Sequence, residues 1–223
     1  MKVFLVLAIA TVLPQEKNEA EELFKKMEEK LVKAKTVHLK LEGSMEPMEF
    51  KITGELWLGE GGRVRMDLEG KSGDMVRSVS MVSDGTTVNT SSDDRKKSFK
   101  APESFGKLVR TCIARAGFLG TVDTTDSETE AGTEPGEGFT VSEFKMGAKE
   151  KVGERSAQGI EFTVTKKNEK DTAAITLWID VETQLPLKRT LKLGGRSLTE
   201  SYSGLKLDEK IDAAKFEPPK EAK

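Results

Sequence analysis

Strict alternation of apolar and polar side chains in three successive runs, 37–41, 50–58 and 63–68, constrains the fold of this chain most strongly. A period of two is typical of a β-strand that buries one face and exposes the other. Glycine, aspartate and serine separate the runs, as in Ser83-Asp84-Gly85, and these residue types favour tight turns. The first part of the chain therefore predicts an antiparallel meander with one apolar face.

The rest of the chain shows the same pattern. Further strands are predicted at 76–82, 86–90, 139–141, 160–164, 174–179, 185–193 and 198–207, and the last two are expected to form a closing hairpin. No repeat of the solenoid type is visible. The fold class is therefore mainly β, in the α+β sense, with a curved antiparallel sheet covered by helices.

Two segments carry helical spacing instead. In 18–35 the apolar side chains form one continuous face, and Asn18 with Glu21 has the spacing of a capping box. The segment 104–119 has a second such face, and Gly117 is expected to end that helix. The apolar faces consist of Ala20, Leu23, Phe24, Met27, Leu31 and Ala34, and of Phe105, Leu108, Val109, Cys112, Ile113 and Ala116.

The ends and one internal segment are expected to lie outside the sheet. Residues 1–15 predict a signal peptide, because Lys2 precedes an uncharged apolar run that is too short to span a bilayer. The alternative is a buried N-terminal strand. Residues 16–219 are predicted to form a single domain that carries a flexible acidic insertion at 121–138, and 220–223 form a charged tail.

Residues that could carry chemistry are few. The chain has one histidine, His38, and one cysteine, Cys112, so it lacks the residues for a disulfide or a thiolate metal cluster. His38 and Cys112 could form a catalytic pair, or they could be a strand histidine and a buried thiol that do not act together. The second interpretation is favoured. The glycine-rich segment 59–62 precedes a predicted strand rather than a helix, so it predicts a hairpin turn and not a phosphate loop. We expect no metal, no cofactor and no enzymatic activity, although a hydrolase with an unrecognised site stays open as a rival.

The net charge of −2 and the absence of a basic, aromatic-rich segment argue against nucleic acid as a partner. The apolar face of the sheet is then the strongest candidate site. Such a face is either a packed core or a pocket for an apolar ligand, and the methionines favour the pocket because thioethers adapt to varied ligands. The candidate lining residues are Leu39, Leu41, Phe50, Ile52, Leu56, Leu58, Val64, Met66, Leu68, Met81 and Ile113.

Several short motifs in order resemble the periplasmic lipoprotein carriers called LolA and the wider superfamily of half-barrel lipid binders. They are the helix before Thr36-Val37-His38-Leu39, then Gly54-Glu55-Leu56-Trp57-Leu58, Val82-Ser83-Asp84-Gly85-Thr86-Thr87-Val88, Trp178-Ile179-Asp180 with Leu185-Pro186-Leu187, and Ile211-Asp212-Ala213-Ala214-Lys215-Phe216. The resemblance implies an incomplete antiparallel barrel whose apolar cavity is closed by helices. It also implies a periplasmic carrier that shields the acyl chains of lipoproteins or lipids during localisation to the outer membrane.

Carriers of this family place an Arg-Pro after the Leu-Trp strand, and that arginine latches the helical lid. Here Glu60-Gly61 stand at that place, so Arg63 or Arg65 is the possible lid contact. The partners implied are acylated lipoproteins or lipids, an inner-membrane release complex and an outer-membrane receptor, and we expect a monomer. The alternative function is a periplasmic sensor of lipid or lipoprotein on the same scaffold, which binds a protein partner.

Overall fold

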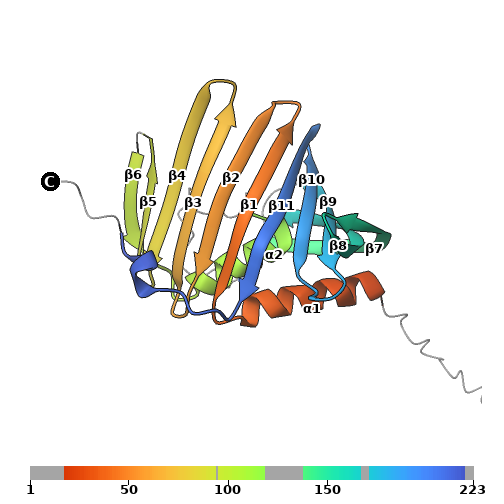
Figure 1. Ribbon diagram of the computed structural model, residues 1–223, viewed down its shortest axis with the longest axis horizontal. Coiled ribbons are helices and arrows are strands. Elements are labelled where there is room, and N and C mark those ends of the chain that lie inside the picture. Colours follow the sequence, from red (N-terminus) through yellow and green to blue (C-terminus); the bar gives the residue numbers. More distant parts are fainter. Residues whose placement is uncertain (1–17, 94, 119–137, 167–170, 219–223) are drawn as a thin grey trace, which may run out of the picture.

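One antiparallel sheet of eleven strands forms the body of the molecule, in the order β6-β5-β4-β3-β2-β1-β11-β10-β9-β8-β7 (Figure 1). The computed structural model describes residues 18–93, 95–118, 138–166 and 171–218. The strands are β1 Val37–Glu46, β2 Phe50–Leu58, β3 Arg63–Ser72, β4 Met75–Asp84, β5 Thr87–Ser92, β6 Arg95–Lys100, β7 Phe139–Val152, β8 Arg155–Lys166, β9 Thr172–Asp180, β10 Pro186–Leu193 and β11 Arg196–Leu207. The helices are α1 Glu19–Lys33, α2 Phe105–Ala116 and the 3-10 helix η1 Ala213–Phe216.

The sheet consists of two meanders that meet in its middle. Strands β1 to β6 and strands β7 to β11 each follow in chain order, and β1 joins the two groups by pairing with β11 from Val37↔Leu207 to Glu46↔Ser197. The sheet is curved, and strands β6 and β7 are its two edges, so it stays open. This confirms the predicted mainly β half-barrel with helices, including the β10–β11 closing hairpin.

Helix α1 forms where the sequence predicts it. The Asn18 side chain accepts from the backbone N–H groups of Ala20 and Glu21, which satisfies two donors of the first turn. Phe24 packs its ring 5.2 Å from that of Phe144 and 4.9 Å from that of Phe162, so the buried face of α1 rests on β7 and β8. These aromatic contacts fix α1 across the inner face of the sheet.

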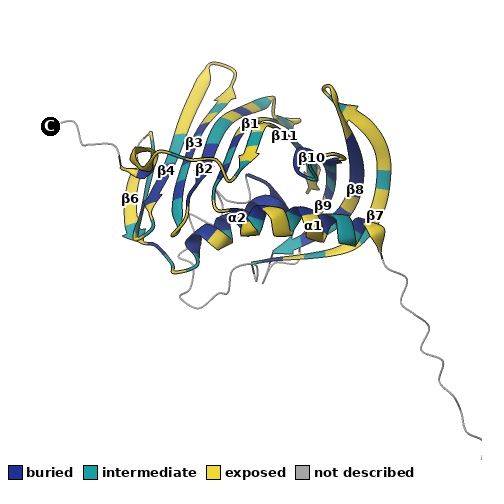
Figure 2. Cartoon of the chain, turned by 60° about the horizontal axis from the view of Figure 1, so that its bottom comes forward, coloured by how far each residue is buried: buried dark blue, intermediate teal, exposed yellow. Residues whose placement is uncertain are grey.

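Helix α2 lies on the same side of the sheet as α1 (Figure 2). Arg115 of α2 and Glu28 of α1 join the two helices with a distance of 2.6 Å from Nε to Oε1. Helix α2 ends at Gly117, as predicted, and this residue has a φ of +82°. Glycine adopts that region without the steric cost that a Cβ carries.

The turn between β2 and β3 is the predicted hairpin connection, and the N–H of Gly59 bonds to the carbonyl of Arg63 at 2.8 Å. After β11 the chain crosses to the outer face of the sheet. There Phe216 of η1 is buried near Gly59 and Arg63, and Lys215 places its Nζ 4.7 Å from the centre of the Trp57 ring. This C-terminal segment therefore covers the lower ends of β2 and β3.

The predicted signal peptide at 1–15, the acidic insertion at 121–138 apart from Gly138, and the tail at 220–223 lie outside the described residues. No helix in the ranges that the structure describes is long and apolar enough to cross a membrane.

Candidate functional site

The inner face of the sheet, which we define as the face toward α1 and α2, consists of apolar side chains stacked in rows across neighbouring strands. One row runs Leu39↔Leu56↔Met66↔Met81 through β1, β2, β3 and β4, and each of these side chains is at most 1% exposed. Alternation along each strand puts its apolar residues on one face, and the register brings those faces into line.

All eleven predicted lining residues belong to this inner side. Ten are buried in the hydrophobic core cluster, and Phe50 is partly buried against it. The buried ten are Leu39, Leu41, Ile52, Leu56, Leu58, Val64, Met66, Leu68, Met81 and Ile113 of α2. The structure thus brings the whole set together on the inner side, with Phe50 at its open end.

Burial changes along the inner face from the helices toward the hairpin ends. The row Leu191↔Leu198↔Met45↔Phe50, drawn from β10, β11, β1 and β2, lies nearest the β1–β2 and β10–β11 turns. In this row only Leu198 is fully buried, and the other three are partly exposed. Along β1 and β2 the inner face therefore stays apolar up to its open end, where the helices no longer cover it.

Arg110 ties the beginning of α2 to the sheet. Its guanidinium is buried and donates to the carbonyls of Gly106, Lys35 and Gly59 at 3.0, 3.1 and 3.2 Å. Burial lowers the pKa of this guanidinium, although the charge of Asp208 acts in the opposite direction. The three carbonyls come from α2 itself, from the segment before β1 and from the β2–β3 turn, so one side chain connects α2 to two loops.

A second buried charged cluster meets the other end of α2. Arg189 of β10 donates to the carbonyls of Ile113 and Ala114 at 3.0 and 2.7 Å, and Arg189 and Glu200 are register partners on β10 and β11. Glu200 accepts from the N–H of Phe118 at 3.1 Å and from the hydroxyl of Tyr202. A cation at a helix C-terminus interacts favourably with the helix dipole.

We call Arg189, Glu200 and Tyr202 the inner charged cluster. Arg189 and Glu200 are each 1% exposed, and burial is the main cause that raises the pKa of the Tyr202 hydroxyl far above its usual value. The sequence pattern did not predict this cluster. Its signal was a charged residue at an inward position of each closing strand, since Arg189 lies two residues from Leu187 and Leu191, and Glu200 two residues from Leu198 and Tyr202.

The structure corrects the expected lid contact of Arg63 and Arg65. Arg63 donates to the Glu60 carbonyl at 3.0 Å and lies over the Phe216 ring, while Arg65 bonds to Asp67 and to the Lys215 carbonyl. Both therefore contact the outer face and the C-terminal segment. The physical reason is alternation, because Val64 and Met66 face inward and turn their neighbours outward.

His38 and Cys112 lie on opposite faces of the sheet. The Nε2 atom of His38 is 2.7 Å from Oε1 of Glu55, and its ring stacks on Trp57 on the outer face. Cys112 is buried in α2 on the inner side, where burial raises the pKa of its thiol to about 12. The two side chains are therefore separated by the sheet. Within the described ranges no three His, Cys, Asp or Glu side chains gather in a group that could hold a metal ion.

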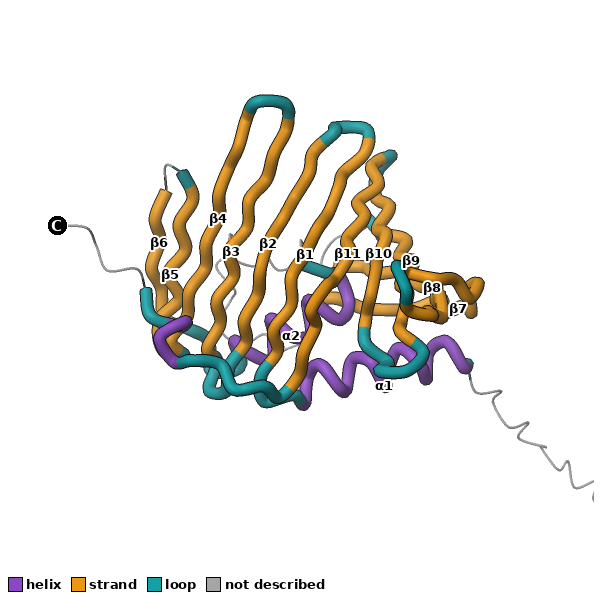
Figure 3. Tube along the Cα trace, in the orientation of Figure 1, coloured by secondary structure: helices purple, strands orange, loops and turns teal. Residues whose placement is uncertain are grey.

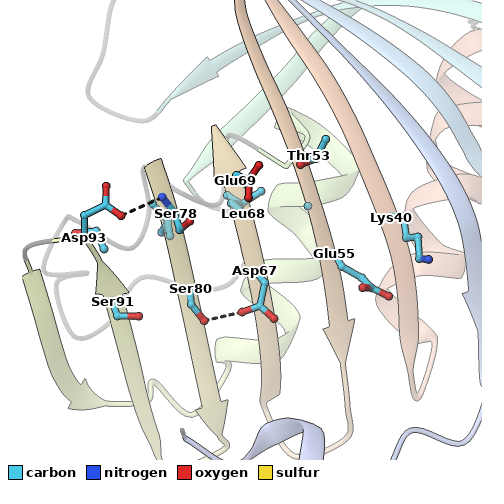
Figure 4. Close-up of a pocket in the computed structure, with 13 residues that line it drawn as sticks. Lys40, Thr53, Glu55, Asp67, Leu68, Glu69, Ser78, Ser80, Ser91 and Asp93 are labelled. Carbon is cyan, nitrogen blue, oxygen red and sulfur yellow. Dashed lines mark hydrogen bonds between the residues drawn. The ribbon is translucent and has the colours of Figure 1, made fainter. Parts of the chain in front are cut away.

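The outer face carries a polar hollow of about 600 Å³ over β1 to β5 (Figure 4). The hydroxyl of Ser80 donates to Asp67 at 2.7 Å, and the N–H of Ser78 donates to Asp93 at 3.3 Å. A smaller hollow of about 530 Å³ lies between the end of α1 and the β9–β10 turn. The residues around the first hollow are Lys40, Thr53, Gly54, Glu55, Asp67, Leu68, Glu69, Ser78, Val79, Ser80, Ser91, Ser92 and Asp93.

Comparison with known proteins identifies the fold. No protein-family model matches the chain, and no curated protein matches it. Among solved structures, LprF from Mycobacterium bovis is similar with 12% identity and a TM-score of 0.52, over 88% of this chain and 96% of that chain. The LolA superfamily protein NE2245 from Nitrosomonas europaea matches with 9% identity and a TM-score of 0.36, over 89% of this chain and 97% of that chain.

The complex of MucA and MucB from Pseudomonas aeruginosa also matches, with 13% identity and a TM-score of 0.45, over 90% of this chain and 61% of that chain. Identities this low show the fold alone, and of these three structures LprF has a TM-score above 0.5, so the argument from likeness rests on LprF. Together with the topology above, the likeness to LprF confirms the half-barrel fold that the sequence predicts.

Proposed function

We propose that this protein is a periplasmic carrier that binds the acyl chains of lipoproteins or lipids on the inner face of its half-barrel, for lipoprotein localisation to the outer membrane. The observation that carries the proposal is the apolar inner face, which is covered by an amphipathic helix and continues, partly exposed, to the open end of the sheet. An apolar surface of this kind selects a ligand by its hydrocarbon content rather than by polar groups.

Helix α2 is the natural lid in this proposal. Each buried methylene of a ligand contributes about 0.8 kcal/mol, so an acyl chain can compete with the apolar face of α2 for the same sheet surface. Closed and open forms then differ by a modest free energy, and cargo binding shifts the population between them. Binding of this kind needs neither a cofactor nor an enzymatic step.

The inner charged cluster supports a reversible lid. Replacing a buried ion pair by apolar residues is often neutral or stabilising, so such a cluster is weak evidence for stability alone. Arg189 instead meets α2 through two carbonyl contacts at the end of the helix, at 3.0 and 2.7 Å. These directional contacts are lost completely on a small displacement of α2, whereas apolar contacts decline gradually.

The first test is native mass spectrometry of the protein purified from an exported fraction under mild conditions, followed by lipid extraction. We expect acyl-chain species at near-stoichiometric amounts. A mass without ligand that stays unchanged after addition of acylated peptide and phospholipid would show that the inner face is only a packed core.

A matched pair of variants locates the binding surface. Met45 faces inward and is partly exposed, whereas its neighbour Ser44 faces outward and is exposed. Binding is measured as the displacement of a fluorescent fatty acid by palmitate. We expect Met45→Glu to abolish this displacement, and Ser44→Glu to leave it unchanged. Thermal unfolding of both variants separates a binding defect from a folding defect, and equal binding by the two variants would refute the assignment.

A regulator that senses lipid and binds a protein partner is the second candidate, and the polar hollow on the outer face favours it. The hollow lies on the other side of the sheet from the inner apolar face, so a partner there would leave the cargo surface free. Co-purification from the exported fraction distinguishes the two functions. Loss of a bound protein in a Glu69→Lys variant, with acyl binding retained, would favour the regulator.

A further inference from the structure

Large apolar side chains that are exposed gather at one end of the molecule. Among the residues that the structure describes, six large hydrophobic side chains are exposed, namely Met48 52%, Met75 57%, Val76 49%, Met146 45%, Val181 53% and Leu193 43%. Met48 lies in the β1–β2 turn, Met75 and Val76 directly follow the β3–β4 turn, and Leu193 directly precedes the β10–β11 turn. Four of the six therefore belong to three hairpin tips.

The three hairpins project from the same edge of the sheet. Their strands are neighbours in the order β4-β3-β2-β1-β11-β10, and the turns form the end of the sheet opposite α1 (Figure 3). Lys51 of β2 pairs with Lys71 of β3, and Glu46 of β1 pairs with Ser197 of β11, so the tips stand at similar height. We call the segments 46–51, 71–77 and 192–197 the rim.

Basic side chains surround the apolar tips. The rim carries five exposed bases, which are Lys51, Lys71, Arg77, Lys192 and Arg196, against the exposed acids Glu46, Glu49 and Asp74. Long basic side chains can keep their charge among headgroups while an apolar neighbour enters the lipid. The excess of bases is complementary to a surface of anionic lipid.

The rim also continues into the inner face. Met45 and Phe50 stand at the two ends of the β1–β2 turn, and they belong to the partly exposed row with Leu191 and Leu198. Along β1 and β2 the next row inward is Gly43↔Ile52, so an acyl chain that leaves a bilayer at the rim would meet no polar side chain on these two strands. On β10 and β11 the same row holds Arg189 and Glu200, so the connection from the rim to the covered apolar rows beneath α2 runs over β1 and β2.

We propose that the rim docks on the surface of a bilayer that contains anionic phospholipid, with Met48, Met75, Val76 and Leu193 entering the interface. A bilayer fits better than a protein partner because the apolar residues stand on three separate turns. A protein interface usually centres on anchors in one continuous patch, whereas the exposed methionine, valine and leucine side chains of the rim stand apart on separate turns. Apolar tips flanked by bases are instead the arrangement of segments that lie in the membrane interface.

The inference goes beyond the proposed carrier function, and it can be tested without cargo. The full chain is mixed with vesicles of phosphatidylcholine alone, or of equal parts of phosphatidylcholine and phosphatidylglycerol, and bound protein is measured by flotation. We expect binding to the anionic vesicles that weakens as salt is raised. Absence of flotation with both vesicle types would overturn the proposal.

Two variants define the surface. Met75→Ser together with Leu193→Ser should weaken vesicle binding about tenfold or more, because two apolar side chains no longer enter the interface. Val181→Ser is the matched control, since Val181 is equally exposed at the opposite end of the sheet, in the β9–β10 turn. Equal weakening by both changes, or no weakening by the double variant, would refute rim docking.

Two further outcomes keep the proposals apart. If palmitate displaces the fluorescent fatty acid normally in vesicle-free solution but the protein does not float, rim docking fails and the carrier proposal stands. If the protein floats but binds no acyl chain, docking stands and the carrier proposal fails. A concentration-dependent dimer that the double variant abolishes, without flotation, would assign the rim to a second copy of the chain and overturn docking.

Discussion

Gly117, at the end of helix α2, offers the most direct test of how the neighbouring charged side chains hold this helix in place. Gly117 has φ +82° and ψ −169°, a region that is almost confined to glycine, and an alanine there costs about 1–3 kcal/mol in backbone strain. A Cβ would also lie 2.7 Å from Nη1 of Arg189 and closer still to Oε2 of Glu200. Displacing a charged hydrogen-bonding group costs about 1.5–3 kcal/mol more. We therefore expect Gly117→Ala to lower the free energy of unfolding by about 2.5–6 kcal/mol.

Urea unfolding followed by far-ultraviolet circular dichroism measures this change. The control is Gly153→Ala, because Gly153 has a φ of +62° but nothing within 4 Å of the added Cβ, so only the left-handed cost of about 1–2 kcal/mol applies. In a Glu200→Ala background, the additional effect of Gly117→Ala should become smaller, because the close contact with Glu200 is gone and the one with Arg189 remains. The reasoning is refuted if Gly117→Ala costs no more than the control, or if its effect is the same in both backgrounds.

Three further predictions concern separate parts of the molecule. Asn18→Ala removes the side-chain cap of α1 and should cost about 1 kcal/mol in urea unfolding, and an unchanged midpoint would show that the cap is dispensable. The Cys112 thiol, with a pKa of about 12, stays protonated at pH 8 in the native state; it should react with a disulfide reagent on the order of a thousandfold more slowly than in urea, and equal rates would contradict its burial. Hydrogen bonds, first from the Thr86 side chain and then from the N–H groups of Thr87 and Thr86, lower the pKa of Asp84. Its contribution to stability is therefore present above the unfolded value of about 3.9 and is lost as the pH falls through the folded value. Asp84→Asn should make the acid loss of stability shallower, by a small amount since the group is exposed, and acid titration of the two unfolding midpoints checks this.

Much of the fold was predictable because alternation and turn residues act locally. The runs in β2 and β3 predicted which side chains face inward, and Gly59–Gly62 predicted the hairpin between them. Long-range pairing was less accessible. Nothing in the local pattern of β1 specifies that its second neighbour is β11, because that choice depends on how the two meanders close.

Only part of the candidate site could be predicted from the sequence, for a related reason. An apolar face follows from periodicity, so its lining residues were found as a set, although their role with lipid stays a prediction. The resemblance to one motif predicted a lid contact at Arg63 or Arg65, whereas the guanidinium that meets the end of α2 belongs to Arg189. A charged residue at an inward strand position breaks the pattern, and such breaks deserve the same weight as the pattern itself.

The pairing of β1 with β11 has a consequence for how the chain acquires its structure. The N–H of Lys35, just before β1, bonds to the side chain of Asp208, just after β11, across a separation of 173 residues. Contacts so distant in sequence form late, because the entropy of closing the intervening chain must be overcome first. The centre of the sheet can therefore be completed only after nearly the whole chain has been synthesised, so a nascent chain should remain without its final sheet until the last strand is available.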